Sequence, residues 1–410
     1  MIVFANRSQK HVAIRSQVRC NTHEILMVLL AWFVGTPDHR NRAAPGKAKK
    51  LEKLAMRSLY SAIPAGLPGA VLLAASLAAS LAAPPAWAGE VNVYSSRQPF
   101  LMKPLLEAFT EATGIEVNMA YMKNGMLERL RAEGANSPAD AILTTDIGNL
   151  DNHAKAGLLQ PIESRVLEAN IPAQYRHPDG LWFGLTMRAR VIFAHKDRVR
   201  PGEVTSYEDL ADPKMKGRVC SRSGKHAYNI SLLASIVAAE GEAAAEAWAS
   251  GVKANLARRP QGNDRSQVKA IKEGECDVAL GNTYYMGKMA TNEKQPEQKE
   301  WAAAVRIVFP NQDGPNQIGR GTHVNISGAA VTKSAKHRDD AVKLIEYLSG
   351  DAAQAIYAQR NFEYPVKPGV PLLPLVASWG DFKADSTALS KIAEFRITAS
   401  KIMDRVAFDH

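Results

Sequence analysis

Residues 276–289 read CDVALGNTYYMGKM, an apolar run that passes through a polar turn into a second, amphipathic segment. The run 276–280 predicts a short buried strand, and the segment after the turn predicts a helix. The hydroxyl of Thr283 can cap that helix, which puts Tyr284 and Tyr285 in its first turn. In open α/β sheets, ligands bind at the strand ends where such turns gather. Taken alone, an adjacent tyrosine pair more often packs against an interface, with one phenol wet and the other buried.

The same alternation of strand and helix patterns fills the chain from residue 89 onward. Strands are expected at 91–94, 115–119, 141–144, 185–194, 218–220, 302–309 and 327–332, and helices at 100–113, 126–133, 226–240, 242–256, 265–273, 339–348 and 352–359. The β-α-β-α-β order at the start of this region implies a parallel sheet flanked by helices. Its 322 residues suit two α/β lobes of ordinary size. Such pairs usually bind a ligand in the cleft between the lobes and close by a hinge motion.

Residues 1–88 have the character of a leader. Residues 70–83 are 14 small or apolar residues, too few to span a bilayer as a helix. Arg57 precedes this run, and the sequence AWA at 86–88 ends it with the pattern of a signal-peptidase site. We therefore expect an upstream extension followed by a cleaved signal peptide at about 56–88. Because no cysteine lies near the cleavage point, the mature protein is expected in the periplasm, neither as a lipoprotein nor stably inserted in the membrane.

The formal net charge of +10 invites a nucleic-acid interpretation, but the distribution of charge argues against it. The first 88 residues hold 11 Lys and Arg against 3 Asp and Glu, and the remaining 322 residues hold 40 against 38. The basicity therefore belongs mostly to the leader. Neither zinc-finger spacing nor an RNA-recognition signature is present, so no nucleic-acid partner is expected.

Three strand-to-helix turns carry polar residues at their tips: SSRQ at 95–98, RSGKHAY at 222–228 and TYY at 283–285. Each is expected to present free backbone N–H groups at a helix N-terminus, including those after Ser96, and such groups favour anions. Because a tyrosinate is itself an anion, a phenol in such a first turn should have a lowered pKa. The sequence therefore predicts an anion-binding edge that includes tyrosines.

Two arginine-bearing segments accompany these turns. In the segment TMRARVI at 186–192, Arg188 and Arg190 share one face of the predicted strand. An arginine at a strand end usually forms a surface ion pair. The segment RRPQGNDR at 258–265 is interpreted mainly as a solvated helix cap.

After the leader, the chain contains only two cysteines, Cys220 and Cys276. In an oxidising compartment an even pair can form one disulfide. Because both precede tyrosine-bearing segments, we expect them on neighbouring strands. The alternative is two buried free thiols that behave as small hydrophobic groups.

Together these motifs resemble the ferric-iron-binding periplasmic proteins of bacterial iron-uptake ABC transporters. The resemblance covers roughly residues 90–409, and its most specific parts are VYSSRQPFL (93–101), SPADAILTTDIG (137–148), FGLTMRARVIF (183–193), RSGKHAYNISL (222–232), RRPQGNDRSQVKAI (258–271) and GNTYYMGKM (281–289). It implies the two-lobed type II periplasmic-binding-protein fold with a hinge and an interlobe cleft. It also implies that Tyr284 and Tyr285 are an adjacent pair of iron ligands and that Tyr228 is a third.

The lobes implied by the resemblance are an N-terminal lobe of 89–187 and about 315–360, and a C-terminal lobe of 188–314 and about 361–410. Many members of the family carry a His, often followed by Tyr, where this chain has Gln98 and Pro99, and neither of these is a good ligand. The chain thus resembles the subset with three tyrosinates and a synergistic carbonate or bicarbonate.

In that subset, Arg97, Gln98 and Arg188 become candidates for anion binding, and Asp146 for an additional ligand. Ferric iron prefers hard oxygen donors, which suits phenolates. The expected function is capture of ferric iron in the periplasm and delivery, as a monomer, to an inner-membrane ABC permease.

Two other classes remain open. One is a binding protein of the same fold for an organic anion or a polyamine, which would not need three phenolates. The other is a two-lobed enzyme, but no paired carboxylate, Walker-type loop or nucleophile elbow is convincing, so no enzyme activity is expected. The scattered histidines are interpreted as surface or structural groups: His153, His177, His195 and His323.

Overall fold

A central mixed sheet organises the part of the chain that the computed structural model describes, residues 89–313 and 319–410. The strand order is β2-β1-β3-β9-β5-β7-β6, with β4, β8 and β10 pairing on β9 or β5. The strands are β1 (Gly89–Ser95), β2 (Ile115–Tyr121), β3 (Ala141–Thr145), β4 (Leu159–Gln160), β5 (Phe183–His195), β6 (Val219–Cys220), β7 (Val278–Asn282), β8 (Val305–Val308), β9 (Val324–Thr332) and β10 (Tyr364–Pro365). The predicted leader lies outside the described residues.

The first three strands form the expected parallel unit. β1 lies between β2 and β3 and pairs with both in parallel. Helix α4 (Pro99–Thr113) connects β1 to β2 and ends at Gly114, which adopts a left-handed conformation with φ 74° and donates its N–H to the carbonyl of Thr110. Helix α5 (Met126–Glu133) connects β2 to β3. These elements confirm the predicted order β-α-β-α-β.

The rest of the sheet is antiparallel except for β6, which pairs in parallel with β7, so the expectation of a parallel sheet holds only for these two parts. The long strand β5 pairs with β9 through Phe183–Ala189 and with β7 through Arg190–Ala194. We call the strands around β1 and β9 the first half and those around β7 the second half. β5 is therefore one continuous strand that belongs to both halves, and its change of partner falls between Ala189 and Arg190.

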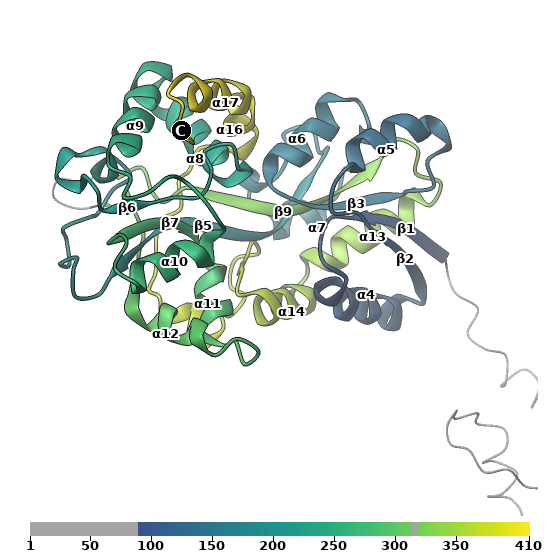
Figure 1. The fold of residues 1–410 in the computed structure, drawn as a ribbon. Coiled ribbons are helices and arrows are strands. Elements are labelled where there is room, and N and C mark those ends of the chain that lie inside the picture. Colours follow the sequence, from purple (N-terminus) through teal and green to yellow (C-terminus); the bar gives the residue numbers. More distant parts are fainter. Residues whose placement is uncertain (1–88, 314–318) are drawn as a thin grey trace, which may run out of the picture. The chain divides into compact units, whose positions relative to one another are not determined.

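Helices cover both faces of each half (Figure 1). In the second half, α8, α9, α16 and α17 lie on one face and α10, α11 and α12 on the other; in the first half, α5 and α6 lie opposite α4, α13 and α14. Their bounds are α6 (Ile147–Lys155), α7 (Arg165–Asn170), α8 (Ala227–Glu240), α9 (Glu242–Ala254), α10 (Asp264–Lys272), α11 (Tyr284–Ala290), α12 (Glu297–Ala304), α13 (Arg338–Ser349), α14 (Asp351–Asn361), α15 (Pro374–Ala377), α16 (Leu389–Glu394) and α17 (Arg396–Arg405). Within the described ranges no helix is long and apolar enough to cross a membrane.

Two predicted strands differ from the observed elements. The strand expected at 276–280 lies two residues later, as β7, and the Asp277 side chain just before it forms ion pairs with Arg198 and Arg218. The strand expected at 302–309 begins as the end of α12 and becomes β8 only at Val305. The shift of β7 matters for the site, because it extends the strand through Asn282 and starts α11 directly at Tyr284.

Candidate metal centre

Three phenols meet at the carboxyl ends of β6 and β7. Tyr284 and Tyr285 are the first two residues of α11, and Tyr228 is the second residue of α8. The Oη atoms of Tyr228 and Tyr284 lie 3.0 Å apart, and the rings of Tyr284 and Tyr285 have centroids 4.4 Å apart. In the described ranges no three His, Cys, Asp or Glu side chains gather in a way that would hold a metal ion. The tyrosine cluster therefore presents up to three hard oxygen donors in one place.

The pKa values of the paired phenols move in the direction opposite to the one expected from the sequence. Burial raises the pKa of Tyr284 well above its ordinary value of 10.0, and the neighbouring phenols of Tyr228 and Tyr285 raise it further. Burial and the carboxylate of Asp264 likewise raise the pKa of Tyr285. Loss of solvent and like charge thus outweigh the helix N-terminus, so both phenols are neutral at pH 7 until something displaces their protons.

Thr283 does not cap α11 with its hydroxyl, contrary to the sequence prediction. Its φ and ψ of −51° and −44° are already helical. The hydroxyl instead accepts a hydrogen bond from the backbone N–H of Ala189, at 3.3 Å. This contact ties the start of α11 to β5 at the position where β5 changes partner.

Asp264 anchors two arginines beneath the Tyr228 ring. Its carboxylate lies 2.8 Å from Arg190 and 2.9 Å from Arg222, and it also accepts the N–H of Asn282. The guanidinium carbons of Arg190 and Arg222 lie 5.8 and 5.1 Å from the centre of the Tyr228 ring. Asp264 is fully buried, so the solvated cap expected at 258–265 is wrong at this residue. The buried charge is tolerated because two cations pair with it.

Arg188 also faces Tyr228, with its guanidinium carbon 5.7 Å from the ring centre. Arg188 and Arg190 therefore share the predicted face, but both are buried and neither forms the surface ion pair typical of a strand end. Within the described residues, neither Nη1 nor Nη2 of Arg188 has a hydrogen-bond partner. Only a longer ion pair of 3.6 Å joins Nη2 to Asp146. Arg188 thus keeps unused donors beside the phenols.

Asp146 caps α6 and is fully engaged by other groups. Its carboxylate accepts the N–H of Gly148, lies 2.9 Å from Arg396, and accepts from the amide of Asn325. Its φ of 77° is uncommon for a residue other than glycine. In this structure the candidate ligand Asp146 therefore serves as the partner of Arg188 and Arg396.

The first half brings Arg97 to the site but not Gln98. Arg97 is buried and forms a two-pronged ion pair with Glu363, with its Nη2 2.9 Å from the carboxylate. Glu363 also accepts from Thr186, and although burial alone would raise its pKa, Arg97 holds that pKa at about 2. Gln98 is exposed and donates to the hydroxyl of Tyr121, 3.1 Å away.

The turn before α4 offers fewer free amides than expected. The N–H of Ser96 donates to the carbonyl of Leu143, and the N–H of Arg97 donates to the hydroxyl of Ser95. Pro99, the first residue of α4, has no N–H to donate. The anion-binding capacity predicted after Ser96 is therefore reduced.

Two further basic groups at the cluster were not predicted. Lys288 lies one turn after Tyr284, with its Nζ 4.9 Å from that ring, and burial lowers its pKa to about 8. Arg265 lies with its guanidinium carbon 5.6 Å from the ring centre of Tyr285. The spacing of four residues between Tyr284 and Lys288 on a helix was a usable signal.

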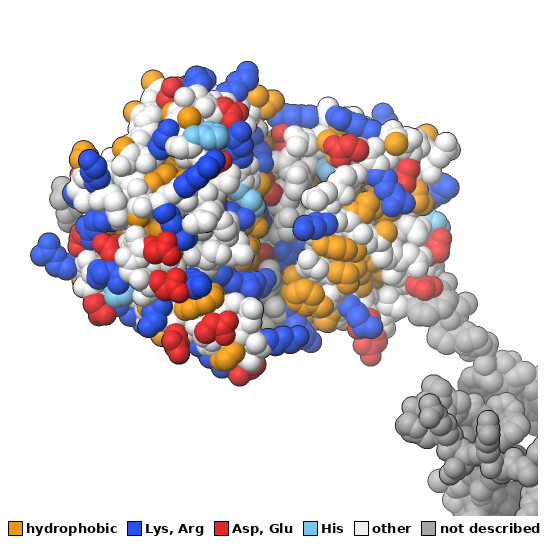
Figure 2. Space-filling model, viewed as in Figure 1, with side chains coloured by type: hydrophobic (Ala, Val, Ile, Leu, Met, Phe, Trp, Pro, Cys, Tyr) orange, Lys and Arg blue, Asp and Glu red, His pale blue; other side chains and the backbone are white. Residues whose placement is uncertain are grey.

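A hollow between the two halves carries basic side chains along its walls (Figure 2).

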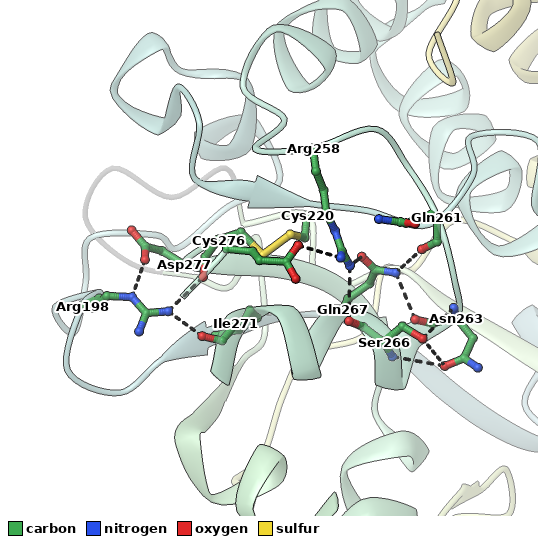
Figure 3. Close-up of a disulfide and its surroundings, with 11 residues drawn as sticks. Arg198, Cys220, Arg258, Gln261, Asn263, Ser266, Gln267, Ile271, Cys276 and Asp277 are labelled. Carbon is green, nitrogen blue, oxygen red and sulfur yellow. Dashed lines mark hydrogen bonds and ion pairs between the residues drawn. A yellow bond between two sulfur atoms is a disulfide. The ribbon is translucent and has the colours of Figure 1, made fainter. Parts of the chain in front are cut away.

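A disulfide joins the end of β6 to the segment that leads into β7, the two strands that precede the tyrosine turns. Cys220, the last residue of β6, bonds to Cys276, two residues before β7 (Figure 3). β6 is only two residues long and pairs in parallel with β7 through Val219 and Cys220. Because β6 leads to Tyr228 and β7 to Tyr284, the disulfide fixes the two strands that position both phenols.

Comparisons with known proteins agree with this architecture. A family model described as "Bacterial extracellular solute-binding protein" matches residues 136–381. The chain is 50% identical over 320 residues to "Iron uptake protein A1" of Synechocystis, which covers 78% of this chain and 87% of that protein. The solved ferric iron-binding protein A of Mannheimia haemolytica, in an open conformation, has a TM-score of 0.74 and 50% identity, and covers 79% of this chain and 100% of its own.

A solved Trichodesmium protein in complex with iron and citrate ligands has a TM-score of 0.75 and 44% identity, and covers 78% of this chain and 100% of its own. These solved relatives are periplasmic binding proteins with two lobes. The chain therefore belongs to the bacterial extracellular solute-binding proteins, a family of two-lobed transport proteins and not of enzymes, and its relatives include proteins named for iron uptake and ferric-iron binding.

Proposed function

We propose that this protein captures ferric iron through the phenolates of Tyr228, Tyr284 and Tyr285 and delivers it to an ABC permease in the inner membrane. The observation that carries the proposal is the 3.0 Å separation of two phenol oxygens from different helices, with the third tyrosine beside them. Such a group of hard oxygen donors suits a small, highly charged cation. The names of the relatives, which refer to iron uptake and ferric-iron binding, support the same cargo.

An exogenous anion completes the coordination in this proposal. Three phenolates balance the ion's charge but fill only three positions, whereas octahedral coordination by oxygen requires about six. Carbonate or bicarbonate would add two oxygens, which fills five positions and leaves the sixth to a further oxygen donor such as water. Arg188 supports this step, since its buried Nη1 and Nη2 have no hydrogen-bond partner in the described part of the chain. A planar guanidinium binds oxyanions through paired hydrogen bonds.

The charge balance around the phenols also favours an anion. Basic side chains outnumber carboxylates there: Arg97, Arg188, Arg190, Arg222, Arg265, Lys288 and Arg396 face Asp146, Asp264 and Glu363. The three negative charges of the phenolates cancel the +3 charge of one ferric ion, so the surplus of positive charge remains. An anion that carries at least two negative charges would reduce this surplus.

The anion-binding roles differ among the residues named for them. Arg188 is the proposed anion partner, and Arg97 acts mainly through its pair with Glu363, close to Tyr284. Gln98, bonded to Tyr121, takes part only if the two halves approach each other. Asp146 becomes an iron ligand only if it leaves Arg188 and Arg396.

We assign the N-terminal lobe to 89–187 and about 315–360, and the C-terminal lobe to 188–314 and about 361–410. The change of partner along β5 at Ala189 and Arg190 supports the first boundary. In this proposal the protein works as a monomer in the periplasm after removal of its signal peptide. Closure of the lobes over iron and anion would present the loaded form to the permease.

The anion is tested by measuring ferric-iron affinity in protein depleted of bicarbonate, then after adding back bicarbonate or citrate. The proposal predicts weak binding that recovers with bicarbonate, and a smaller recovery in Arg188→Ala. If citrate but not bicarbonate restored the affinity, the anion in this proposal would be a hydroxycarboxylate instead of carbonate. Equal affinity with and without any anion would mean that protein groups complete the coordination, and Asp146 would be the first residue to substitute.

A further inference from the structure

Arg396, the first residue of α17, reaches from the second half of the molecule to the first. Helix α17 packs on α8 and α9, which cover the second half (Figure 1). The guanidinium of Arg396 nevertheless lies at the start of α6 in the first half, with Nη1 2.9 Å from the carboxylate of Asp146. The side chains of Arg396 and Asp146 are only 19% and 4% exposed. Solvent therefore screens this ion pair less than it screens a pair on the surface.

The second residue of α6 leaves room for this contact. A Cβ on Gly148 would overlap Nε and Cζ of Arg396, so any side chain at position 148 would displace the guanidinium. The backbone does not itself require glycine there, since the φ of Gly148 is not in the left-handed region. Alanine would normally stabilise a helix better than glycine does. The glycine at this position thus serves the approach of Arg396 to Asp146.

The carboxylate of Asp146 is held by groups other than Arg188. Its Oδ1 accepts the N–H of Gly148 and faces Arg396, and its Oδ2 accepts the amide of Asn325 at 3.1 Å. Oδ2 lies 3.6 Å from Nη2 of Arg188, which is too far for a hydrogen bond. Arg188 therefore stays without a hydrogen-bond partner in the described part of the chain, although a buried carboxylate lies next to it.

We propose that Arg396 is a positioning residue of the metal centre: it holds Asp146 at the start of α6 and so keeps the donors of Arg188 free for the bound anion. Without Arg396, the carboxylate of Asp146 would lose its closest cation, and Arg188 would be the nearest one left. The two side chains would then form a direct charged hydrogen bond, which would occupy donors of Arg188. The effect on the anion rests on the proposed function, whereas the effect on the distance between Arg188 and Asp146 does not.

The first test is a crystal structure of iron-free Arg396→Ala beside that of the iron-free parent. We expect the distance from Nη2 of Arg188 to Oδ2 of Asp146 to shorten from 3.6 Å to less than about 3.2 Å. Arg396→Lys keeps a positive charge beside Asp146 and should preserve the longer separation. An unchanged separation in Arg396→Ala would overturn the proposal, whatever the protein binds.

The second test is the recovery of ferric-iron affinity when bicarbonate is added back to depleted protein. The recovery should be about tenfold smaller in Arg396→Ala than in the parent, and Arg396→Lys should restore most of it. Arg396→Ala/Asp146→Asn should also restore it, because a neutral amide competes weakly for Arg188. Arg396→Ala/Glu394→Gln has the same net charge but should not, since Glu394 is exposed on α16 and pairs with Lys391.

Arg405→Ala is the matched control, because it removes an ion pair from the other end of α17, with Glu242 and Glu246, and should leave the recovery unchanged. Thermal unfolding of each variant shows whether it is folded. Full recovery in Arg396→Ala would overturn the proposal. Equal rescue by Asp146→Asn and Glu394→Gln would also overturn it, because Arg396 would then act only through net charge. A parent whose affinity does not depend on bicarbonate would contradict the proposed function, and the crystal structures would then decide the role of Arg396 alone.

Discussion

At the scale of single residues, Tyr284 and Tyr285 are held as neutral phenols next to a surplus of positive charge. Burial raises the pKa of Tyr284 and Tyr285, whereas Arg188, Arg190 and Arg222 lie over Tyr228. A cation that displaces the phenolic protons converts this arrangement into phenolates that are flanked by arginines. The site thus favours a metal ion strong enough to deprotonate phenol.

Substituting each tyrosine by Phe tests the ligand set. Tyr228→Phe, Tyr284→Phe and Tyr285→Phe keep the rings, so unfolding free energy without iron should fall by no more than about 1 kcal/mol for a lost phenol hydrogen bond. Iron affinity should fall by more than the roughly 10- to 100-fold typical of an outer-shell substitution. Tyr347→Phe, on α13, is the control. A variant that binds iron like the parent removes its residue from the ligand set.

Proton release on iron binding follows from the raised phenol pKa values. Because the phenols of Tyr284 and Tyr285 are protonated at pH 7, each must lose a proton to become a ligand. We expect at least two protons per iron from this pair, after correction for those of the iron source. Tyr285→Phe should release about one fewer. Affinity should therefore fall as the pH falls, and a pH-independent affinity would contradict phenolate ligation.

The pair of Arg97 and Glu363 is expected to matter for stability first. Arg97→Ala leaves the Glu363 carboxylate buried without its paired cation, which should cost about 3–5 kcal/mol in urea unfolding at pH 7. The double variant Arg97→Met/Glu363→Leu should recover much of that loss. Since the folded pKa of Glu363 is about 2, below its ordinary 4.5, its contribution is present above pH 4.5 and is lost as the pH falls toward 2.

At the scale of elements, two short strands and two helix N-termini position the site. α8 follows β6 and α11 follows β7, and the disulfide of Cys220 and Cys276 joins these strands. Thr283 further ties α11 to β5. Tyr228 and Tyr284 therefore depend on one edge of the sheet for their relative placement.

Removing the disulfide tests this dependence. Its cysteines are 56 residues apart, and closing such a loop constrains the unfolded chain by about 4 kcal/mol in the chain-entropy description. Cys220→Ser/Cys276→Ser should lose stability of that order, and its iron affinity should fall, but by less than in Tyr284→Phe. A reducing agent should lower the stability and the iron affinity of the parent protein, and should leave both unchanged in the double variant. Unaltered iron affinity in the double variant would show that the ladder alone places the phenols.

Local patterns predicted most of these elements, because caps and periodicity are short-range properties. The helix at 126–133 matches α5, and the helix at 100–113 differs from α4 only by Pro99. The three tyrosines fall in first turns as predicted, since that follows from strand and helix order. Local patterns did not predict burial or pairing where these depend on a residue that is distant in the sequence. Glu363 lies 177 residues from Thr186, and the burial of Asp264 depends on Arg190, 74 residues away. Burial also raises the pKa of Tyr284, although its place at a helix N-terminus predicted a lowered pKa, and the burial of this side chain depends on residues distant in the sequence.

At the scale of the whole described molecule, β5 joins both halves and carries groups of the candidate metal centre along its length. Arg188 belongs to the pairing with β9 and Arg190 to the pairing with β7, yet both lie over Tyr228. Relative movement of the two halves would therefore change the surroundings of the phenols directly. In the proposed function, this arrangement would connect capture of the ion at residues of the second half to closure by the first.

The most direct test of this account is a visible-absorption titration of the protein with ferric iron at pH 7 in the presence of bicarbonate. Phenolate ligation predicts a broad charge-transfer band that grows linearly and saturates at one iron per chain. The band should weaken or shift in each of Tyr228→Phe, Tyr284→Phe and Tyr285→Phe, and remain unchanged in Tyr347→Phe. A protein that stays colourless while iron is retained, or that retains no iron at all, would contradict the claim that these three tyrosines form a ferric-iron site.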